Sequence, residues 1–449
     1  MNPPVSGIIE YTSRTIYGMT SHNVPMYRFR PLDVSLPSCI VASKNKYRLN
    51  MLALVDWDRV SPRGALHKLI GPCGDWNSEK ACLMYQYRLK GLPAGSTILI
   101  PPLLSSPPLL QGYTFNIDPP GCTDIDDVFT IGIDDYYYIT IADVARWIPY
   151  NEESFQVASR LSQTLYSPRG VVLQPLLPGI QQDCSLVANE LRFGVSLRFR
   201  LVDGQIIDPT FLETRVINDK STTYEDVRID IHPEYIHALE LVSNAVSGTQ
   251  STDPHDWVAN LMILYNTEAA KVVKQAGTGL LRHHDAPTAE KLEAYSALGA
   301  DGRHLAFESA KYVPASENSH HWGLNVLYCH ATSPIRRCAD IVNQFVLKGQ
   351  TPPIVDHEAL NRRDKDLKKY NRDAFFLDTL QNAGDIRKVA GIAVNDHRIW
   401  VPEWKRLITC QHTFQPGTQG IVHYSLDMNG STWKRKMDFR FSNSSTPES

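Results

Sequence analysis

Four aspartates crowd into ten residues of this sequence: Asp118, Asp124, Asp126 and Asp127, with Pro-Pro-Gly directly after the first. Carboxylates this close repel one another and cost stability unless a partner neutralises them. A hard divalent cation does so through oxygen ligands, and Mg²⁺ typically keeps water and substrate phosphate in its remaining positions. From residue types alone, a metal site, an acidic surface turn and a weak calcium loop all stay open, although the spacing excludes an EF-hand.

A second polar segment, 332–337, reads Thr-Ser-Pro-Ile-Arg-Arg and has the pattern of a helix start. Ser333 could cap such a helix, which would put Arg336 and Arg337 in its first turn. Two cations are slightly unfavourable there. The cost is understandable if backbone N–H groups and guanidinium groups together bind phosphate. The alternative for Arg337 is a surface ion pair with Asp340.

The elements that must position these segments mix strands and helices. Three stretches have the β-branched and apolar content of strands: 128–133, 137–144 and 193–201. From about residue 254, apolar side chains recur every three to four residues, which is typical of a helix. Another helix is expected over 357–382, stopped by Gly384. The sequence therefore predicts a mixed α+β block over residues 111–385.

The two flanks are richer in strands. Residues 1–110 alternate short strand-like segments with turns and predict a small β-barrel. The Pro-rich stretch 101–108 suits a linker. Residues 386–449 are β-rich again, and we expect the Ser-rich end, 442–449, to be disordered. The predicted fold class is a multidomain α+β protein.

Composition excludes several classes of protein. The net charge of −3 is not that of a protein that coats nucleic acid with its whole surface. If nucleic acid is the ligand, the basic contacts must be concentrated in one groove. No apolar run reaches the roughly 18 residues of a membrane span, and no secretory signal is visible. We therefore expect no membrane partner. Eight scattered cysteines without a C-x-x-C pair disfavour structural zinc and disulfides, and predict buried free thiols in an intracellular protein, cytoplasmic or nuclear.

The aspartate segment closely resembles the signature of the RNB domain, shared by ribonucleases II and R and by the catalytic subunit of the eukaryotic RNA exosome. Its D-P-P-G-C-x-D-I-D-D form is most similar to the eukaryotic branch. Further motifs follow in the family's order: I-A-D-V at 141–144, Y-S-P-R-G at 166–170, T-Y-E at 223–225, L-L-R-H-H at 280–284 and T-S-P-I-R-R at 332–337. The resemblance covers about residues 111–385. More weakly, the flanks resemble a cold-shock OB barrel and a degenerate terminal OB barrel.

This resemblance implies a hydrolytic 3′-to-5′ exoribonuclease that degrades single-stranded RNA to nucleoside 5′-monophosphates. The reaction would use two Mg²⁺ ions roughly 4 Å apart, and Mn²⁺ could replace Mg²⁺. Asp118, Asp124, Asp126 and Asp127 would hold the metal. Asp126, Asp124 and Arg336 are the candidate catalytic residues, and loss of Asp126 should be the most damaging.

The resemblance also implies contacts to RNA. Tyr166 corresponds to a family tyrosine that packs against the 3′-terminal nucleotide, a contact worth roughly 1–3 kcal/mol per base. Arg336 would contact the scissile phosphate, and Arg337 is a weaker candidate. Arg282 either faces the RNA channel or forms a structural ion pair. The charges of the helix over 357–382 are either a solvated face or part of the channel lining.

Departures from the family pattern leave other functions open. Thr140, Cys338, Gln344 and Asn371 stand where relatives often carry histidine, tyrosine, histidine and glutamate. They indicate a divergent member, although none removes a metal ligand. One alternative is a weakened or inactive RNB-fold protein that binds RNA or acts as a scaffold, and another is a metal-dependent phosphodiesterase for DNA or small nucleotides. A monomer is compatible with the sequence, no protein partner can be named, and a virus-encoded enzyme would look the same.

Overall fold

The computed structural model describes residues 4–45, 47–87, 98–101, 106–296, 298, 305–382, 387–410, 413–427 and 436–443. Gly384, residues 102–105 of the Pro-rich stretch and residues 444–449 of the Ser-rich end lie outside this described part. The predictions made for them therefore stay predictions. Ser442 and Asn443 end the strand Met437–Asn443, so the disorder expected from residue 442 onward is wrong for these two residues.

The N-terminal strands close into a barrel: β1 (Val5–Ile9), β2 (Met26–Pro31), β3 (Cys39–Ala42), β4 (Met51–Asp56) and β5 (Arg63–Pro72). Their order is β1-β2-β3-β5-β4, and β1 also pairs with β4. The interior is apolar, with Ile9, Phe29 and Val55 fully buried. Helix α1 (Trp76–Gln86) follows, and the Asp75 side chain caps it by accepting a hydrogen bond from the Ser78 amide. The predicted β-barrel is confirmed.

The central sheet has the order β12-β11-β8-β7-β6-β13. Its strands are β6 (Gly112–Asp118), β7 (Asp127–Gly132), β8 (Tyr137–Ala142), β11 (Leu191–Val202), β12 (Gln205–Ile217) and β13 (Lys220–Thr223). All neighbours are antiparallel except β13, which runs parallel to β6. A first apolar core joins this sheet to the helices α5 (Pro233–Ser247) and α6 (Pro254–Ala276), with Trp257 and Tyr265 fully buried.

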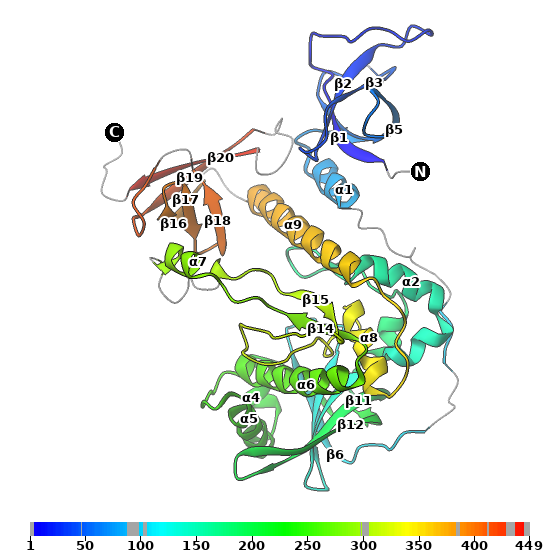
Figure 1. Ribbon diagram of the computed structural model, residues 1–449, viewed down its shortest axis with the longest axis vertical. Helices are drawn as coiled ribbons and strands as arrows, with labels where there is room; N and C mark the ends of the chain where they lie inside the picture. Colours follow the sequence, from blue (N-terminus) through cyan, green and yellow to red (C-terminus); the bar gives the residue numbers. More distant parts are fainter. Residues whose placement is uncertain are drawn as a thin grey trace.

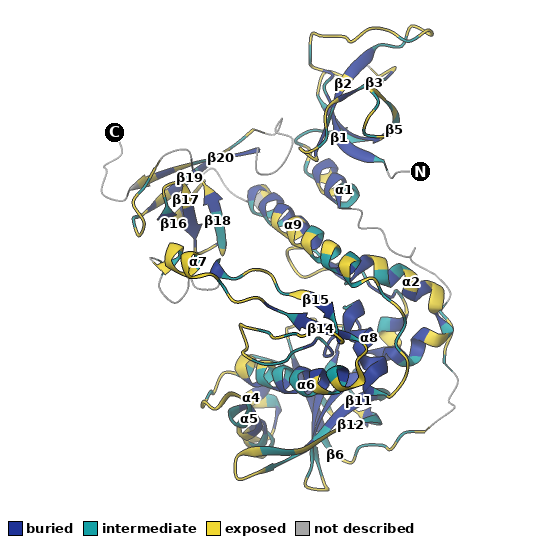
Figure 2. Cartoon of the chain, in the orientation of Figure 1, coloured by how far each residue is buried: buried dark blue, intermediate teal, exposed yellow. Residues whose placement is uncertain are grey.

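A second core holds a different set of elements: η1 (Ala145–Tyr150), α2 (Glu152–Leu161), α3 (Ile180–Cys184) and α8 (Cys338–Leu347). Every residue of α8 is buried, as the dark blue ribbon in Figure 2 shows. The remaining short elements are β9 (Leu165–Tyr166), β10 (Val172–Gln174), α4 (Val227–Asp230), β14 (Leu280–His283), α7 (Ala289–Ala294) and β15 (Lys311–Pro314).

Helix α9 (His357–Asn382) connects the central part to both flanks (Figure 1). Its apolar face shares one core with α1 and with a five-stranded C-terminal sheet. That sheet has the order β18-β17-β16-β19-β20, with strands β16 (Lys388–Asn395), β17 (Arg398–Val401), β18 (Arg406–Thr409), β19 (Gln419–Leu426) and β20 (Met437–Asn443). A buried ion pair between Lys436 and Glu79 ties the start of β20 to α1.

The multidomain α+β class with OB-type flanking sheets is confirmed. The predicted domain boundaries at residues 110 and 385 stay predictions. Six of the eight free cysteines are buried, as expected. Among the described residues, no helix is both long and apolar enough to cross a membrane.

Candidate active site

The aspartate segment forms the connection between β6 and β7. Asp118 is the last residue of β6 and Asp127 the first of β7, so adjacent strands of the central sheet fix both ends of the loop. Gly121 adopts a left-handed φ of 78°, which a residue with a side chain would reach only with strain. Ser185 anchors the loop by accepting from the Ile125 amide at 2.9 Å and donating to the Thr123 carbonyl at 2.9 Å.

One pocket of about 300 Å³ is lined by the predicted acidic residues and their partners: Asp118, Asp124, Asp126, Asp127, Tyr166 and Arg336. These residues come from three segments, namely the β6–β7 loop, strand β9 and the segment before α8. The sequence had linked them only through their family motifs, whereas the structure brings their side chains around one space.

Asp126 is the most buried of the aspartates that line this pocket, with 4% of its surface exposed. One carboxylate oxygen, Oδ1, accepts from the Ile335 amide at 3.0 Å, and Oδ2 lies 3.6 Å from Nε of Arg336. Burial raises the pKa of Asp126 to about 7, against the opposing charge of Arg336. Asp126 therefore joins the acidic loop directly to the arginine segment.

The other carboxylates are also held in an environment that disfavours their charge. Burial raises the pKa of Asp127 well above its usual value, and the charges of Asp118 and Asp126 raise it further. Burial likewise raises the pKa values of Asp118 and Asp124. This is the electrostatic situation that a bound cation relieves.

Neighbouring polar groups orient two of these carboxylates. Asn116 donates to Oδ2 of Asp118 at 2.8 Å. The Tyr166 hydroxyl lies at 3.5 Å from Oδ2 of Asp124, which is a weak hydrogen bond at most. Burial, followed by the Asp124 charge, raises the pKa of Tyr166 to about 12. Sequence reasoning missed Asn116 and Ser185, because neither belongs to a motif and their partners become neighbours only in the fold.

The donor set of the pocket fits a hard divalent cation, since it offers carboxylate oxygens and repelling negative charges. However, no group of three or more Asp, Glu, His or Cys side chains within the described ranges is already arranged to hold a metal ion. The chemistry of the site thus fits Mg²⁺, whereas the side chains would have to adjust around it.

The structure corrects the expected helix start at 332–337. Helix α8 begins at Cys338, and Arg337 is its N-cap in extended conformation. Ser333 does not cap the helix; its amide instead donates to Asp340 Oδ1 at 2.7 Å. The reason is a non-local contact, because the Thr164 amide donates to the Arg336 carbonyl at 2.9 Å and holds that segment out of the helix.

The two arginines of this segment face different environments. The Arg336 side chain is 48% exposed and lines the acidic pocket. Arg337 pairs with Asp340, with Nη2 at 2.8 Å from Oδ1, and Asp340 is fully buried. The ion-pair alternative therefore holds for Arg337, but in the interior and not at the surface. Its expected contact with RNA stays a prediction.

Arg282 is also committed to a structural role. Its Nη1 lies 3.4 Å from Asp364, its guanidinium lies 4.4 Å from the centre of the Tyr312 ring, and 8% of the residue is exposed. The ion pair that the sequence offered as one alternative for Arg282 is present, and its contact with RNA stays a prediction. On α9, Arg362, Lys369 and Arg372 form ion pairs with nearby aspartates, as expected for a solvated face.

Most departures from the family pattern lie in the core, away from the acidic pocket. Thr140 shares a hydrogen bond of 2.7 Å with Ser196, and Gln344 bonds to the backbone of Ala142 and Ala145. Cys338 is fully buried. Asn371 is different, because it lines a separate cavity of about 110 Å³ that also touches Tyr166 and Arg336.

Comparison with known proteins identifies the domain that holds this pocket. Residues 109–234 and 303–351 match the RNB domain family. The chain contains an RNB domain. This match includes the whole acidic loop, Tyr166 and Arg336, so the residues that line the pocket belong to the RNB domain.

Relatives and solved structures agree with this assignment. The mouse exosome complex exonuclease RRP44 is 23% identical over 75% of this chain and 46% of its own length. RNase R of Mycoplasma genitalium, solved with single-stranded RNA, superposes with a TM-score of 0.76 at 14% identity, covering 98% of this chain and 90% of that one. Yeast Ssd1, a pseudonuclease, superposes with a TM-score of 0.67 at 13% identity, covering 95% and 67%.

These likenesses have defined limits. The chain spans less than half the length of the mouse relative. At such low identity the structural matches show the RNB fold alone, and that fold occurs both in a nuclease and in a pseudonuclease. The mouse relative is a cellular protein and gives no support to a virus-encoded origin.

Proposed function

We propose that this chain is a metal-dependent 3′-to-5′ exoribonuclease that hydrolyses single-stranded RNA to nucleoside 5′-monophosphates. The observation that carries the proposal is the pocket in which Asp118, Asp124, Asp126 and Asp127 face Arg336 and Tyr166. Carboxylates that hold a cation, a guanidinium for phosphate and an aromatic ring for a base are the parts that this reaction needs.

Each side chain has a part in this proposal. Asp118, Asp126 and Asp127 would hold Mg²⁺ directly or through water, and Asp124 completes the acidic wall. When bound, Mg²⁺ lowers the pKa of the attacking water and stabilises charge on the leaving oxygen. Arg336, exposed on the pocket wall, binds the scissile phosphate and offsets its charge.

The coupling between the two segments supports these roles. The Ile335 amide donates to Asp126, so the residue before Arg336 is fixed to the acidic loop. The backbone that carries Arg336 is therefore held beside the acidic loop without a ligand, which limits the backbone reorganisation needed when RNA binds. Tyr166 offers its ring to the terminal base, and stacking would serve any sequence.

The specific rival is an RNB-fold protein that binds RNA without cutting it. Two observations favour it. Within the described residues, no three carboxylates are already arranged to hold one metal ion. Asn371, which stands where relatives often carry glutamate, lines a cavity that also touches Tyr166 and Arg336. The complete aspartate quartet opposes it, because four crowded, partly or fully buried carboxylates would cost stability without a cation.

A digestion assay separates these readings. The purified chain is incubated with 5′-labelled single-stranded RNA, and with a circular RNA of the same sequence, which has no 3′ end. Each is tested with Mg²⁺ and with a chelator, and a matched deoxyribo-oligonucleotide is included. We expect stepwise shortening of the linear RNA in the presence of Mg²⁺. The circular RNA, the deoxyribo-oligonucleotide and the reactions with chelator should show no shortening. Binding without shortening supports the rival, and equal cleavage of DNA supports a general phosphodiesterase.

A further inference from the structure

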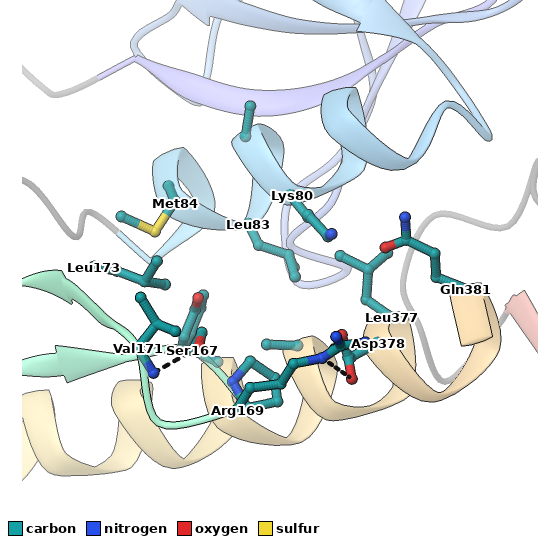
Figure 3. A pocket seen from close by; sticks show the side chains of 14 residues that line it. Lys80, Leu83, Met84, Ser167, Arg169, Val171, Leu173, Leu377, Asp378 and Gln381 are labelled. Carbon is teal, nitrogen blue, oxygen red and sulfur yellow. Dashed lines mark hydrogen bonds and ion pairs between the residues drawn. The ribbon is translucent and has the colours of Figure 1, made fainter. Parts of the chain in front are cut away.

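A second and larger cavity, of about 650 Å³, lies between α1, the loop that joins β9 to β10, and α9 (Figure 3). Its walls are mainly apolar: Ala81, Leu83 and Met84 of α1, Val171 and Leu173 of the hairpin, and Tyr370, Ala374 and Leu377 of α9. This size and composition are those of a small-molecule site. The proposed exonuclease reaction makes no use of it.

The charged side chains of this cavity lie away from Met84 and Leu173, whereas Ser167 lies beside Val171 (Figure 3). In Figure 3, Lys80 and Gln381 lie at one end, whereas Met84, Val171 and Leu173 lie at the other. Arg169 pairs with Asp378, with Nε at 3.2 Å from Oδ1, so that acidic residue already has a cationic partner. Lys80 thus leaves the polar end with an excess of positive charge. Such a cavity suits a ligand with an apolar body and one negative charge.

The hairpin between β9 and β10 forms a wall common to this cavity and the acidic pocket. Tyr166, Gly170 and Val172 line the acidic pocket, whereas Val171 and Leu173 line the second cavity. For residues 171–173 the alternation follows from the extended backbone, in which successive side chains point to opposite faces. Val171 is 62% and Leu173 43% exposed, so both have apolar surface that a ligand could cover.

We propose that this second cavity binds a small amphipathic carboxylate, with its apolar body against Leu83, Met84 and Leu173 and its carboxylate near Lys80. A ligand in this cavity contacts the hairpin on the side opposite the acidic pocket and so restrains its motion. Because the same hairpin carries Tyr166, the ligand also limits how far the Tyr166 ring can move. Any effect of the ligand on RNA hydrolysis rests on the proposed function, but ligand binding and hairpin restraint do not.

Calorimetric titration of the full chain with decanoate tests the binding site. Decyltrimethylammonium has the same chain length and the opposite charge, and it serves as the matched probe. We expect decanoate to bind the more tightly. Lys80→Glu should weaken decanoate about fivefold, the upper range for an exposed ion pair. Lys44→Glu, an equal charge change on an exposed residue of the barrel, should leave the affinity unchanged.

Hydrogen exchange measures the restraint without any enzymatic readout. The Val171 amide donates to Ser167 Oγ at 3.0 Å, and the Ser167 amide to the Val171 carbonyl at 2.7 Å, so both amides report on the hairpin. Decanoate should slow exchange over residues 165–174. Equal affinity for both probes, equal affinity of the two lysine variants, or unchanged exchange at saturation overturns the proposal. Failure of RNA hydrolysis alone would refute the proposed function and leave this site intact.

Discussion

Asp126→Asn removes one charge from the acidic pocket while keeping the shape of the side chain. Oδ1 of asparagine can still accept from the Ile335 amide, the bond that Asp126 makes at 3.0 Å. The loss of Arg336 as a partner should cost little, since that side chain is 48% exposed. We therefore expect a folded variant that still binds RNA and has lost hydrolysis by about 1,000-fold or more, beyond the effect of one neutral contact.

The same substitution has a stability effect whose sign follows from the pKa. Burial raises the pKa of Asp126 to about 7, above the roughly 3.9 of an unfolded aspartate. The folded state thus prefers the protonated acid. The contribution of Asp126 to the free energy of unfolding is therefore fully present below about pH 4 and is lost as the pH rises through 7. Three pKa units correspond to at most about 4 kcal/mol. At pH 8 with a chelator present, the parent must keep the Asp126 carboxylate ionised in a buried position, whereas asparagine is neutral. Asp126→Asn should therefore melt at a higher temperature than the parent.

Three assays on the parent and the variant complete this test. Single-turnover digestion gives the hydrolysis rate, fluorescence anisotropy gives the affinity for RNA, and thermal melting at pH 5 and pH 8 gives the stability difference. Mg²⁺ at about 100 times its dissociation constant should stabilise the parent by roughly 2.7 kcal/mol and the variant by less. The reasoning is refuted if the variant digests RNA at the parental rate, or if it melts below the parent at pH 8 without metal.

Further expectations concern the residues around Asp126. Tyr166→Ala should raise KM about 5- to 160-fold through lost stacking. Tyr166→Phe should match the parent, because the hydroxyl lies 3.5 Å from Asp124, and a large effect of Tyr166→Phe would argue against stacking. Arg336→Ala should lower kcat about 100-fold with an unchanged melting temperature, measured by single-turnover digestion and melting. Arg337→Ala should instead destabilise the fold by about 3–5 kcal/mol in urea titrations, since it strands the buried Asp340, and a variant of parental stability would contradict that ion pair.

Local sequence patterns predicted the regular elements well. The expected helix over 357–382 coincides with α9, and the helical pattern from residue 254 begins where α6 begins. Both have strong periodicity or clear end signals, which depend on neighbours in sequence. The acidic loop was likewise visible, because its four aspartates are close in the chain as well as in space.

The errors arose where distant segments decide the local structure. The helix start at 332–337 shifted to Cys338 because Arg337 is extended and the Thr164 amide bonds to the Arg336 carbonyl. The sequence left two roles open for Arg282, a contact with RNA and a structural ion pair. It could not name the partner, because Asp364 lies 82 residues further along the chain. The second cavity could not be foreseen either, since its walls come from α1, the β9–β10 hairpin and α9.

The central claim is that the pocket between the β6–β7 loop and Arg336 gathers divalent cations. Electron paramagnetic resonance of Mn²⁺ titrated into the full chain measures this directly, because free and bound ions give different signals. The account predicts two bound ions in the parent and the loss of at least one in Asp126→Asn. A parent chain that binds no Mn²⁺, or a variant that binds as many ions as the parent, would contradict it.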